Sequence, residues 1–249
     1  AAPEAERVCS GYLLEHDDTR LLLDCGPGVV HHLARFELPW PRIDHVFLTH
    51  FHNDHTGDLP MLLFALKHAL RPGRTRALTL WGPAGLQERL RAMEAALGSH
   101  VADPGFPLLI RELGPGAALT VGDLRVRVEK TPHTPESVCY RVEARGEAIG
   151  YTGDTGPSDE VARFMAGVDV LVAECSLPDA EAMDTHLTPA SLARMAAVAG
   201  PGRLVLTHVY PHLGARDVPG LVEAAGWSGE TVRAVDGAAY AVDDARLRP

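Results

Sequence analysis

The chain has 249 residues with an ordinary globular hydrophobic share of 46%, so we expect one domain with an ample core, spanning 1–249, and exclude a disordered chain. The formal net charge of −10, from 33 acidic and 23 basic residues, is the reverse of the balance that nucleic-acid-binding proteins usually show, which disfavours large RNA or DNA as a partner. Four scattered cysteines without a Cys-x-x-Cys pair argue against a cysteine zinc site and a disulfide framework, and favour buried free thiols in a reducing cytoplasm. No apolar run approaches about 18 residues, so we expect no membrane partner and a cytoplasmic location.

The first half of the chain alternates strands and helices. Strands are predicted at Gly11–Glu15, Arg20–Asp24, Asp44–Thr49 and Ala77–Trp81, and helices at Val29–Phe36, Leu59–Leu70 and Pro83–Leu97. The apolar run in Asp44–Thr49 is typical of a strand buried on both faces. Proline at the first turn and Gly98 after the end mark the last of these helices.

The second half is richer in strands. Helices are predicted at Ser158–Ala166 and from Thr188 through Ala199, and strands at Phe106–Leu113, Ala118–Lys130, Ser137–Ala144, Ala148–Tyr151, Asp169–Ala173, Arg203–Thr207, Thr231–Val235 and Ala238–Val242. The middle of the chain is a series of hairpins rather than clean βαβ units. This pattern favours an α/β fold of two packed mixed sheets with helices outside over a doubly wound parallel sheet.

The segment after the predicted strand Asp44–Thr49 is dense in side chains that can bind a metal, namely His50, His52, Asp54 and His55. Imidazole and carboxylate groups suit Zn²⁺, and also Mn²⁺ or Fe²⁺. An extended stretch projects His50 and His52 to the same side, whereas Asp54 and His55 point differently, so one loop can serve two neighbouring metals. The alternative is a hydrophilic loop with chance histidines, and three histidines with an aspartate directly after a core strand argue against it.

The pattern His-x-His-x-Asp-His after a strand resembles the signature of the metallo-β-lactamase superfamily. Further segments resemble the later motifs of that family in the same order. Thr131–Thr134 resembles the third-ligand motif, Gly150–Gly156 the bridging-aspartate motif, and Leu206–His208 the final histidine motif. The resemblance spans nearly the whole chain from Ser10 to the last strand. It implies an αββα sandwich of two mixed β-sheets with helices on the outer faces and a site along one edge.

The resemblance implies two divalent metal ions, with Zn²⁺ the first expectation. One ion is held by His50, His52 and His133, the second by Asp54, His55 and His208, and Asp154 bridges both. Taken singly, His133 and His208 are more often ordinary surface or turn histidines and Asp154 a turn former, but the joint pattern favours ligands. Asp24 matches a family position near the site, where it orients a ligand; a turn aspartate at a strand end is the alternative.

Glu174, at the end of a predicted strand, and His186, in Thr185-His186-Leu187-Thr188, resemble two elements of ribonuclease Z and related phosphodiesterases. There the histidine protonates the leaving oxygen and the glutamate orients the histidine. The alternatives are a histidine that merely decorates a helix start and a glutamate at a solvated strand end. The long tRNA-gripping arm of ribonuclease Z is not evident, because His133 and Asp154 are only 21 residues apart and no Gly/basic-rich insertion occurs elsewhere. The first strand of the family also has no full counterpart before Ser10, so the native N-terminus is expected to be longer.

These features predict a hydrolase in which two metals activate a water molecule, Asp54 and Asp154 hold the cations and guide the proton, and His186 acts as the general acid. The first hypothesis for the substrate is a small or cyclic nucleotide-like phosphodiester. The alternatives are a carboxylic ester, thioester or lactone hydrolase, and a metal-binding module that has lost its activity. The complete ligand set argues against the last. A small-molecule substrate is the expected partner, and a homodimer is compatible with these features.

Overall fold

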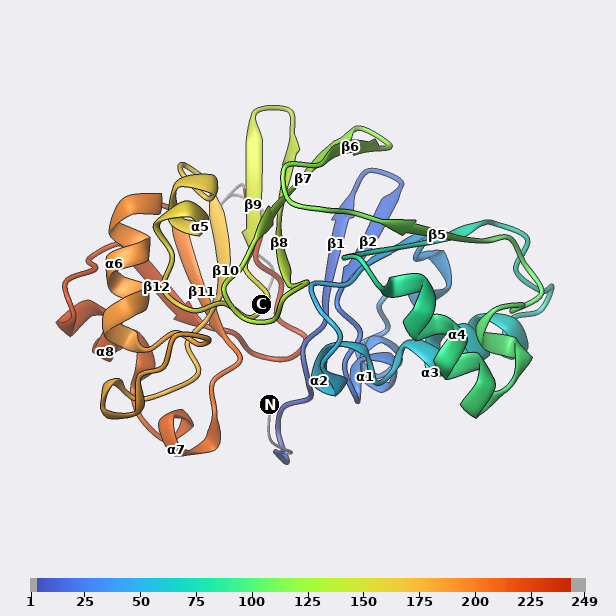
Figure 1. Ribbon diagram of the computed structural model, residues 1–249, viewed down its shortest axis with the longest axis horizontal. Coiled ribbons are helices and arrows are strands. Elements are labelled where there is room, and N and C mark those ends of the chain that lie inside the picture. The colour runs from blue at the N-terminus through green and yellow to red at the C-terminus, as the bar shows by residue number, and fades with distance from the viewer. Residues whose placement is uncertain (1–3, 243–249) are drawn as a thin grey trace. The chain divides into compact units, whose positions relative to one another are not determined.

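Two mixed β-sheets, of five and seven strands, organise the computed structural model, which describes residues 4–242 (Figure 1). The chain divides into two compact units, each built on one sheet. The N-terminal unit is Val8–Gly114, and the C-terminal unit begins at Pro115 and includes the residues before Val8. The predicted α/β class with two mixed sheets is confirmed.

The sheet of the N-terminal unit has the strand order β1-β2-β3-β4-β5. These strands are Tyr12–His16, Thr19–Leu23, His45–Phe47, Leu78–Gly82 and Leu108–Glu112. β1 pairs antiparallel with β2, and the remaining neighbours are parallel. Since β2 and β3 run parallel with Leu23 beside Phe47, the residues that follow them leave the same edge of the sheet.

Helices of the N-terminal unit cover its sheet with leucine-rich faces. They are α1 (Val29–Arg35), α2 (Asn53–Thr56), α3 (Leu59–His68) and α4 (Leu86–Leu97), with 3₁₀ turns at Trp40–Arg42 and Ser99–Val101. Leu62, Leu63 and Leu66 of α3 are fully buried in one cluster with Val46 and Leu80 of the sheet. This burial of apolar area fixes the helices on the sheet.

The sheet of the C-terminal unit has the order β12-β11-β10-β9-β8-β7-β6. In chain order the strands are β6 Ala118–Val121, β7 Leu124–Lys130, β8 Val138–Ala144, β9 Glu147–Tyr151, β10 Val170–Glu174, β11 Arg203–Thr207 and β12 Glu230–Arg233. β9 to β12 are parallel, and β8 is antiparallel to both β7 and β9. Strands β7, β9, β10 and β11 therefore run in one direction, and the segments that follow them emerge at one edge.

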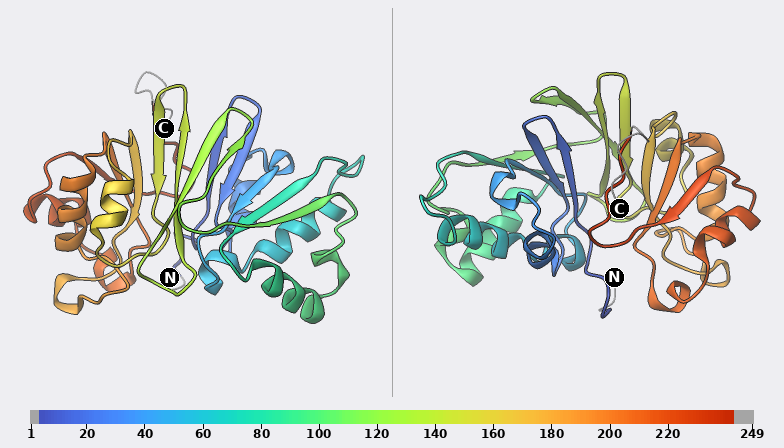
Figure 2. Two further views of the ribbon diagram at one scale, coloured as in Figure 1. Left: turned by 45° about the horizontal axis from the view of Figure 1, so that its top comes forward. Right: turned by 180° about the vertical axis from the view of Figure 1, so that it is seen from behind.

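Helices α5 (Asp159–Phe164), α6 (Pro189–Ala199) and α8 (Val218–Ala224) cover this sheet, and α7 (Pro211–Gly214) and a 3₁₀ turn at Asp179–Glu181 lie in loops. In both views of Figure 2, as in Figure 1, α6 and α8 lie beside β10, β11 and β12. Leu171, Leu204 and Leu206 of the strands are buried in one cluster with Leu192 and Ala196 of α6. This packed core thus supports β10 and β11 and fixes the position of the edge at which they end.

Most predicted elements are present, with four differences. The strand predicted at Ala118–Lys130 is a hairpin, β6 and β7, because Gly122, with φ of 57°, makes a tight turn between Val121 and Leu124. The helix predicted from Pro83 begins at Leu86, after Gly85 in the left-handed region. The prediction of a strand at Ala238–Val242 is wrong, because a turn at Gly237 precedes a segment without strand pairing. Helices α2, α7 and α8 were not predicted.

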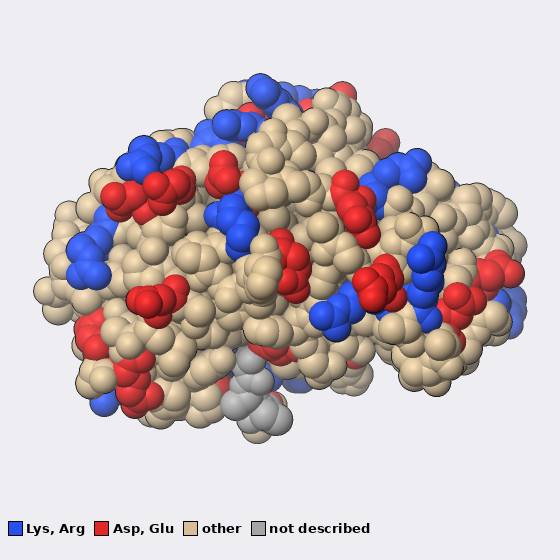
Figure 3. Space-filling model, in the orientation of Figure 1, with Lys and Arg blue, Asp and Glu red and all other residues tan. Residues whose placement is uncertain are grey.

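Within residues 4–242, no helix is long and apolar enough to cross a bilayer. All four cysteines are free thiols, as predicted, and Cys25, Cys139 and Cys175 are buried. On the face that Figure 3 shows, Lys and Arg side chains are interspersed with Asp and Glu.

Candidate metal and catalytic site

The histidine-rich loop of the N-terminal unit turns from β3 into the short helix α2. His50 follows the strand, His52 is the N-cap of α2 in extended backbone, and Asp54 and His55 lie within the helix. The ring nitrogens His50 Nε2 and His52 Nδ1 are 3.1 Å apart, as the predicted same-side projection requires. Thr56 Oγ1 donates to the carbonyl of His52 and closes the turn at 3.0 Å. The loop therefore presents two imidazoles before the helix and Asp54 with His55 on it.

Asp24 orients this loop through buried hydrogen bonds. It directly follows β2, is fully buried, and accepts hydrogen bonds from the backbone and hydroxyl of Thr49 at 2.8 and 2.9 Å. Its Oδ2 also lies 2.7 Å from Nδ1 of His55. The Thr49 hydroxyl is 3.0 Å from Nδ1 of His50, so it links that ring to the carboxylate. One buried carboxylate thus fixes the Nδ1 side of two predicted ligands, as ligand-orienting carboxylates do.

In the C-terminal unit, three predicted ligands converge at the edge where β7, β9 and β11 end. Asp154 is buried, and its Oδ2 is 3.6 Å from His133 Nε2 and 3.4 Å from His208 Nε2. The Nδ1 of His133 is held at 2.9 Å by the carbonyl of Thr185. The parallel register of the sheet brings these residues together although they are distant in the sequence.

The loop around Asp154 depends on a close backbone approach at Gly156. Its amide donates to the carbonyl of Pro132 at 2.9 Å. A Cβ at this position would lie 1.7 Å from the carbonyl oxygen of Asp184, so only glycine fits there. This contact ties the Asp154 loop to the segments that carry His133 and His186.

Glu174, at the end of β10, accepts several buried hydrogen bonds. Its side chain is fully buried and accepts from the backbone of Thr155 at 2.6 Å and of Leu187 at 3.2 Å. It also accepts from the hydroxyl of Ser176, and its two oxygens lie 3.0 and 3.1 Å from Nδ1 of His186. The alternative of a solvated strand end is therefore wrong.

The two buried carboxylates, Asp24 and Glu174, have the same arrangement of hydrogen-bond partners. Ser176 Oγ lies 2.8 Å from Nδ1 of His208 and donates to Glu174, just as Thr49 links His50 to Asp24. In each case a carboxylate holds one imidazole directly and a second through a hydroxyl. Nδ1 of all four rings is thereby engaged, which leaves Nε2 as the atom that can bind a metal or exchange a proton.

The donor set fits divalent metals. Imidazole Nε2 atoms with carboxylate oxygens beside them, and Nδ1 atoms held by carboxylate, hydroxyl or carbonyl groups, are the arrangement that zinc sites use. Glu174, His186 and His208 also form a compact group that could hold a metal. However, the four donors on the Glu174 carboxylate occupy its oxygens, which favours an orienting role for this residue.

His186 is half-buried and lies among aromatic rings. Its ring centroid is 4.8 Å from that of His133 and 5.7 Å from that of His208. Burial lowers the pKa of His186, but the hydrogen bond and charge of Glu174, with the charge of Asp154, outweigh it, so the pKa is raised above its ordinary value. A raised pKa keeps a proton available for transfer.

Two site residues have left-handed backbone without being glycine. Asp24 has φ of 59° and His208 has φ of 52°, and each directly follows a strand. This conformation costs about 1–2 kcal/mol, and aspartate and histidine tolerate it better than most residues. The amide of Asp24 is held by the carbonyl of Phe47 at 2.8 Å. Such backbone outliers cluster at functional sites, where the surrounding structure enforces them.

Sequence reasoning missed three residues that contact the predicted ligands or their loops. Thr49 and Ser176 each stand one or two residues from a chosen residue, and a hydroxyl at that spacing was the available signal. Lys130 was the third. Its ammonium donates to the carbonyls of Thr131, Thr134 and Ser137 and so closes the loop that carries His133. Nothing in the sequence marked this contact beyond the rarity of lysine.

Comparison with known proteins places this arrangement in a family. A family model described as the beta-lactamase superfamily domain matches residues 19–209, a range that includes all seven predicted metal ligands. The chain belongs to the metallo-β-lactamase superfamily. This superfamily member is 29% identical over 218 residues to "Probable metallo-hydrolase YhfI" of Bacillus subtilis, covering 86% of the chain and 85% of the relative. It is 28% identical to ribonuclease Z of Haloferax volcanii over an alignment of 293 positions, covering 95% of the chain and 90% of the relative.

Solved structures of similar fold support the same family. The crystal structure of the metallo-β-lactamase fold protein YhfI from Bacillus subtilis matches with a TM-score of 0.81 and 26% identity, over 94% of the chain and 92% of that structure. Human short-form tRNase Z matches with a TM-score of 0.77 and 24% identity, over 98% and 96%, which shows the fold alone. The predicted metallo-β-lactamase fold is confirmed, and the chain is a metallo-hydrolase of this superfamily related to ribonuclease Z.

Proposed function

We propose that this metallo-hydrolase is a dinuclear phosphodiesterase that acts on a small or cyclic nucleotide-like phosphodiester. Two divalent ions, zinc in the first place, would be held by His50, His52, Asp54, His55, His133, Asp154 and His208. When bound, the ions would lower the pKa of a water molecule and neutralise charge on the phosphate. The relation to ribonuclease Z, an enzyme named for a phosphodiester substrate, supports the substrate class.

The Glu174–His186 pair is the observation that carries the proposal. Nδ1 of His186 is fixed 3.0 Å from the buried carboxylate of Glu174, so the protonated ring offers Nε2–H to a leaving oxygen. The backbone amides of Thr155 and Leu187 hold the carboxylate in place. The imidazole is therefore oriented before substrate arrives, and little reorganisation is needed at the moment of proton transfer.

This pair favours a phosphodiester over an activated carboxylic ester. The alkoxide of a sugar leaves poorly and needs a proton in the transition state, whereas a stabilised leaving group needs little help. A buried carboxylate that raises the pKa of His186 favours the protonated form of the ring, which this task requires. Within the proposal, Asp54 and Asp154 would hold the cations and guide the proton that the metal-bound water gives up.

The test is whether the loss of hydrolytic rate in His186→Ala depends on the leaving group of the substrate. The variant should slow hydrolysis of an alkyl or cyclic nucleotide diester by roughly 10²–10⁴-fold and that of bis(4-nitrophenyl) phosphate far less. Glu174→Gln should give a weaker defect of the same kind, because it only misorients the ring. Metal content should stay at that of the wild type in both. His31→Ala, which changes an exposed histidine on α1, is the matched control.

Three results would contradict the proposal. Loss of metal in His186→Ala would make this residue a ligand. Equal slowing of both substrates with intact metals would point to substrate positioning. No effect on either substrate would favour the carboxylic ester, thioester or lactone alternative, which a substrate panel that includes a lactone and a thioester would then identify.

A further inference from the structure

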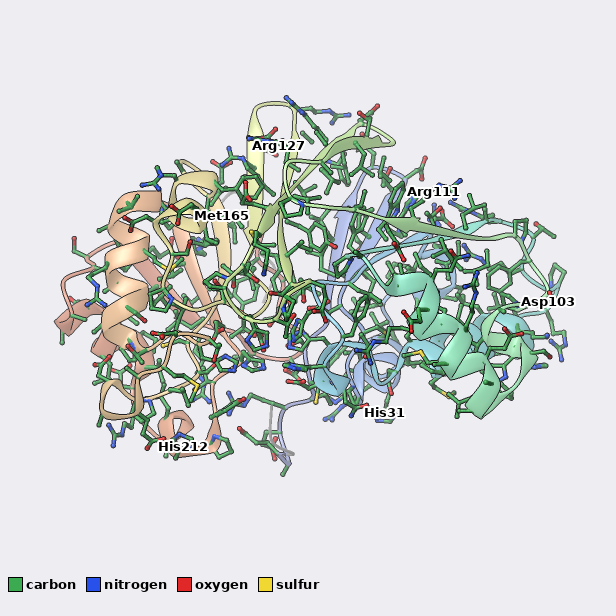
Figure 4. The ribbon with its side chains drawn as sticks, in the orientation of Figure 1. His31, Asp103, Arg111, Arg127, Met165 and His212 are labelled. Carbon is green, nitrogen blue, oxygen red and sulfur yellow. The ribbon has the colours of Figure 1, made fainter. Side chains whose placement is uncertain are left out.

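Two segments of the C-terminal unit lie side by side next to the Glu174–His186 pair. The ring of His186 is 5.7 Å from that of His208 and nearly parallel to it, and 6.0 Å from that of Tyr210. Farther along the same segments, Glu181 Oε2 and His212 Nε2 are 3.2 Å apart. Residues 181–186 therefore run alongside residues 208–212. His212, labelled in Figure 4, lies in α7 at the outer end of this pair of segments.

The second segment presents a series of aromatic rings that becomes more exposed outward. Tyr210 lies 5.4 Å from His208 and 6.0 Å from His212 between ring centroids. His208 is buried, Tyr210 is half-buried, and the side chain of His212 is 46% exposed. On the facing segment, Met183 is 49% exposed and forms a backbone bridge with His186. We call Tyr210 and His212, together with the thioether of Met183 on the facing segment, the aromatic strip.

The chemistry of the strip selects a flat and uncharged ligand. Tyrosine and histidine rings stack on planar groups, and a methionine thioether adapts to them. One ionic group at its outer end is the Glu181 carboxylate, which is paired with His212 and whose charge disfavours a second phosphate beside it. A nucleobase meets these conditions, because every base offers a π-face for stacking and carries no charge at neutral pH.

We propose that the aromatic strip binds the nucleobase of the substrate, with Tyr210 as the residue that determines this specificity. The inference rests on the proposed function, in which His186 protonates the leaving oxygen. A sugar joined to that oxygen lies next to His186, and the Tyr210 ring is the neighbouring surface onto which its base extends. The strip thus assigns the enzyme to nucleoside-containing diesters rather than to simple alkyl diesters.

The experiment compares two ligands that differ only in the base. Adenosine 5′-monophosphate and ribose 5-phosphate are titrated into the zinc-loaded protein by calorimetry, and the ratio of their dissociation constants isolates the contribution of the base. Wild type should prefer the nucleotide by roughly 5- to 150-fold, the range that stacking of one base on an aromatic side chain provides. Tyr210→Leu should bring the ratio close to one, whereas Tyr210→Phe, which keeps the ring, should retain it.

Tyr240→Leu is the matched control, since this half-buried tyrosine of the same unit bonds through its hydroxyl to the backbone of Val235 at 3.1 Å. Its ratio should equal that of the wild type. If Tyr210→Leu fails to fold, Met183→Ala and His212→Ala should each lower the ratio. Equal affinity of the wild type for both ligands would overturn the proposal, as would a Tyr210→Phe variant as impaired as Tyr210→Leu.

Turnover of bis(4-nitrophenyl) phosphate by the wild type separates this inference from the proposed function. Turnover without a base preference contradicts the strip and leaves the phosphodiesterase proposal standing. A base preference that depends on Tyr210, without turnover of any diester, contradicts the phosphodiesterase proposal and supports a base-binding strip.

Discussion

Asp24 and Asp154 are both buried carboxylates that follow strands, yet they approach their histidines from opposite sides of the imidazole ring. Asp24 lies 2.7 Å from Nδ1 of His55, the side away from a metal, whereas Asp154 lies 3.4 Å from Nε2 of His208, the side that would bind one. This difference separates a residue that orients a ligand from a residue placed to be one.

We therefore expect Asp154→Ala to lose more metal and activity than Asp24→Ala. The wild type purified without chelator should contain about two metal ions per chain, as two-metal hydrolases do. Asp24→Ala should weaken metal binding or activity by roughly 10–100-fold, and Asp154→Ala by more. Elemental analysis and a zinc titration would measure both. Wild-type protein with at most one ion at saturating zinc, or two variants with equal affinity, would contradict the assignment.

Lys130 supports the loop of His133 through its ammonium group. Besides the three loop carbonyls, it lies within 3.3 Å of the hydroxyl of Ser137. Lys130→Met leaves these acceptors without their donor, which should lower the free energy of unfolding by about 1–3 kcal/mol and weaken zinc binding. The matched control is Lys67→Met, because the only other lysine of the chain donates at the surface to the carbonyl of Asp103. Denaturant unfolding and zinc titration that give wild-type values for Lys130→Met would contradict this role.

At the scale of elements, α8 shows how a helix on the outer layer is defined. The side chain of Asp217 caps its N-terminus by accepting from the amide of Gly220, and Pro219 occupies the first turn. Val218 and Val222 are buried in the cluster that covers the sheet. The cap and the buried valines together set where this helix begins and which face it buries.

Asp217→Ala should lower the free energy of unfolding by about 1 kcal/mol, because the amide of Gly220 loses its acceptor. Asp217→Asn keeps an acceptor and should stay within a few tenths of a kcal/mol of the wild type. Asp217 is exposed, so neither change removes packing. Chemical denaturation at several pH values would measure both. Equal stability of the alanine variant and the wild type would mean that the cap contributes nothing.

The elements that the sequence predicted well are those with a strong local signal. The strands before His50, Asp154 and His208 were placed correctly because each is an apolar run that ends in a polar loop. Short α2 and α8 were missed although Asp217 and Pro219 formed a valid helix start, because helices of 4 and 7 residues are too short to show a clear helical periodicity. Ala238–Val242 shows apolar residues in a strand-like order, but strand pairing decides such segments, and it is not encoded locally.

The candidate site likewise contains residues that the local sequence identifies and contacts that form only in the folded chain. The ligand types of the histidine-rich loop and of the Gly-Asp-Thr-Gly segment are themselves the signal, so the residues could be chosen without the fold. The spacing of Ser176 from Glu174 was a local signal, but the contact of its hydroxyl with His208 was not, because Ser176 and His208 meet only when β10 and β11 pair in parallel. The donors that fill the Glu174 carboxylate likewise come from two separate loops, Thr155 from the β9–α5 connection and the others from the β10–α6 connection.

For the whole molecule, the balance of charge bears on the class of substrate. The net charge is −10, and basic side chains are interspersed with acidic ones on the face shown in Figure 3. Ribonuclease Z of Haloferax volcanii aligns over 293 residues, more than the 249 of this chain, so it contains segments that this chain lacks. A protein that binds long RNA needs several phosphate contacts from Lys or Arg, and their loss removes most of the affinity.

We therefore expect this chain neither to bind precursor tRNA tightly nor to cut it accurately. At about physiological salt, binding should be no tighter than the roughly 10⁻⁴–10⁻⁶ M of nonspecific contacts, because an acidic surface gains little from the release of counterions. Filter binding across a salt series would measure the affinity, and a cleavage assay with ribonuclease Z of Haloferax volcanii as the positive control would measure processing. A small diester offered to the same preparation shows that the enzyme is active. Sub-micromolar binding with accurate 3′ cleavage would contradict the expectation. It would require a local basic surface on a chain whose net charge is negative.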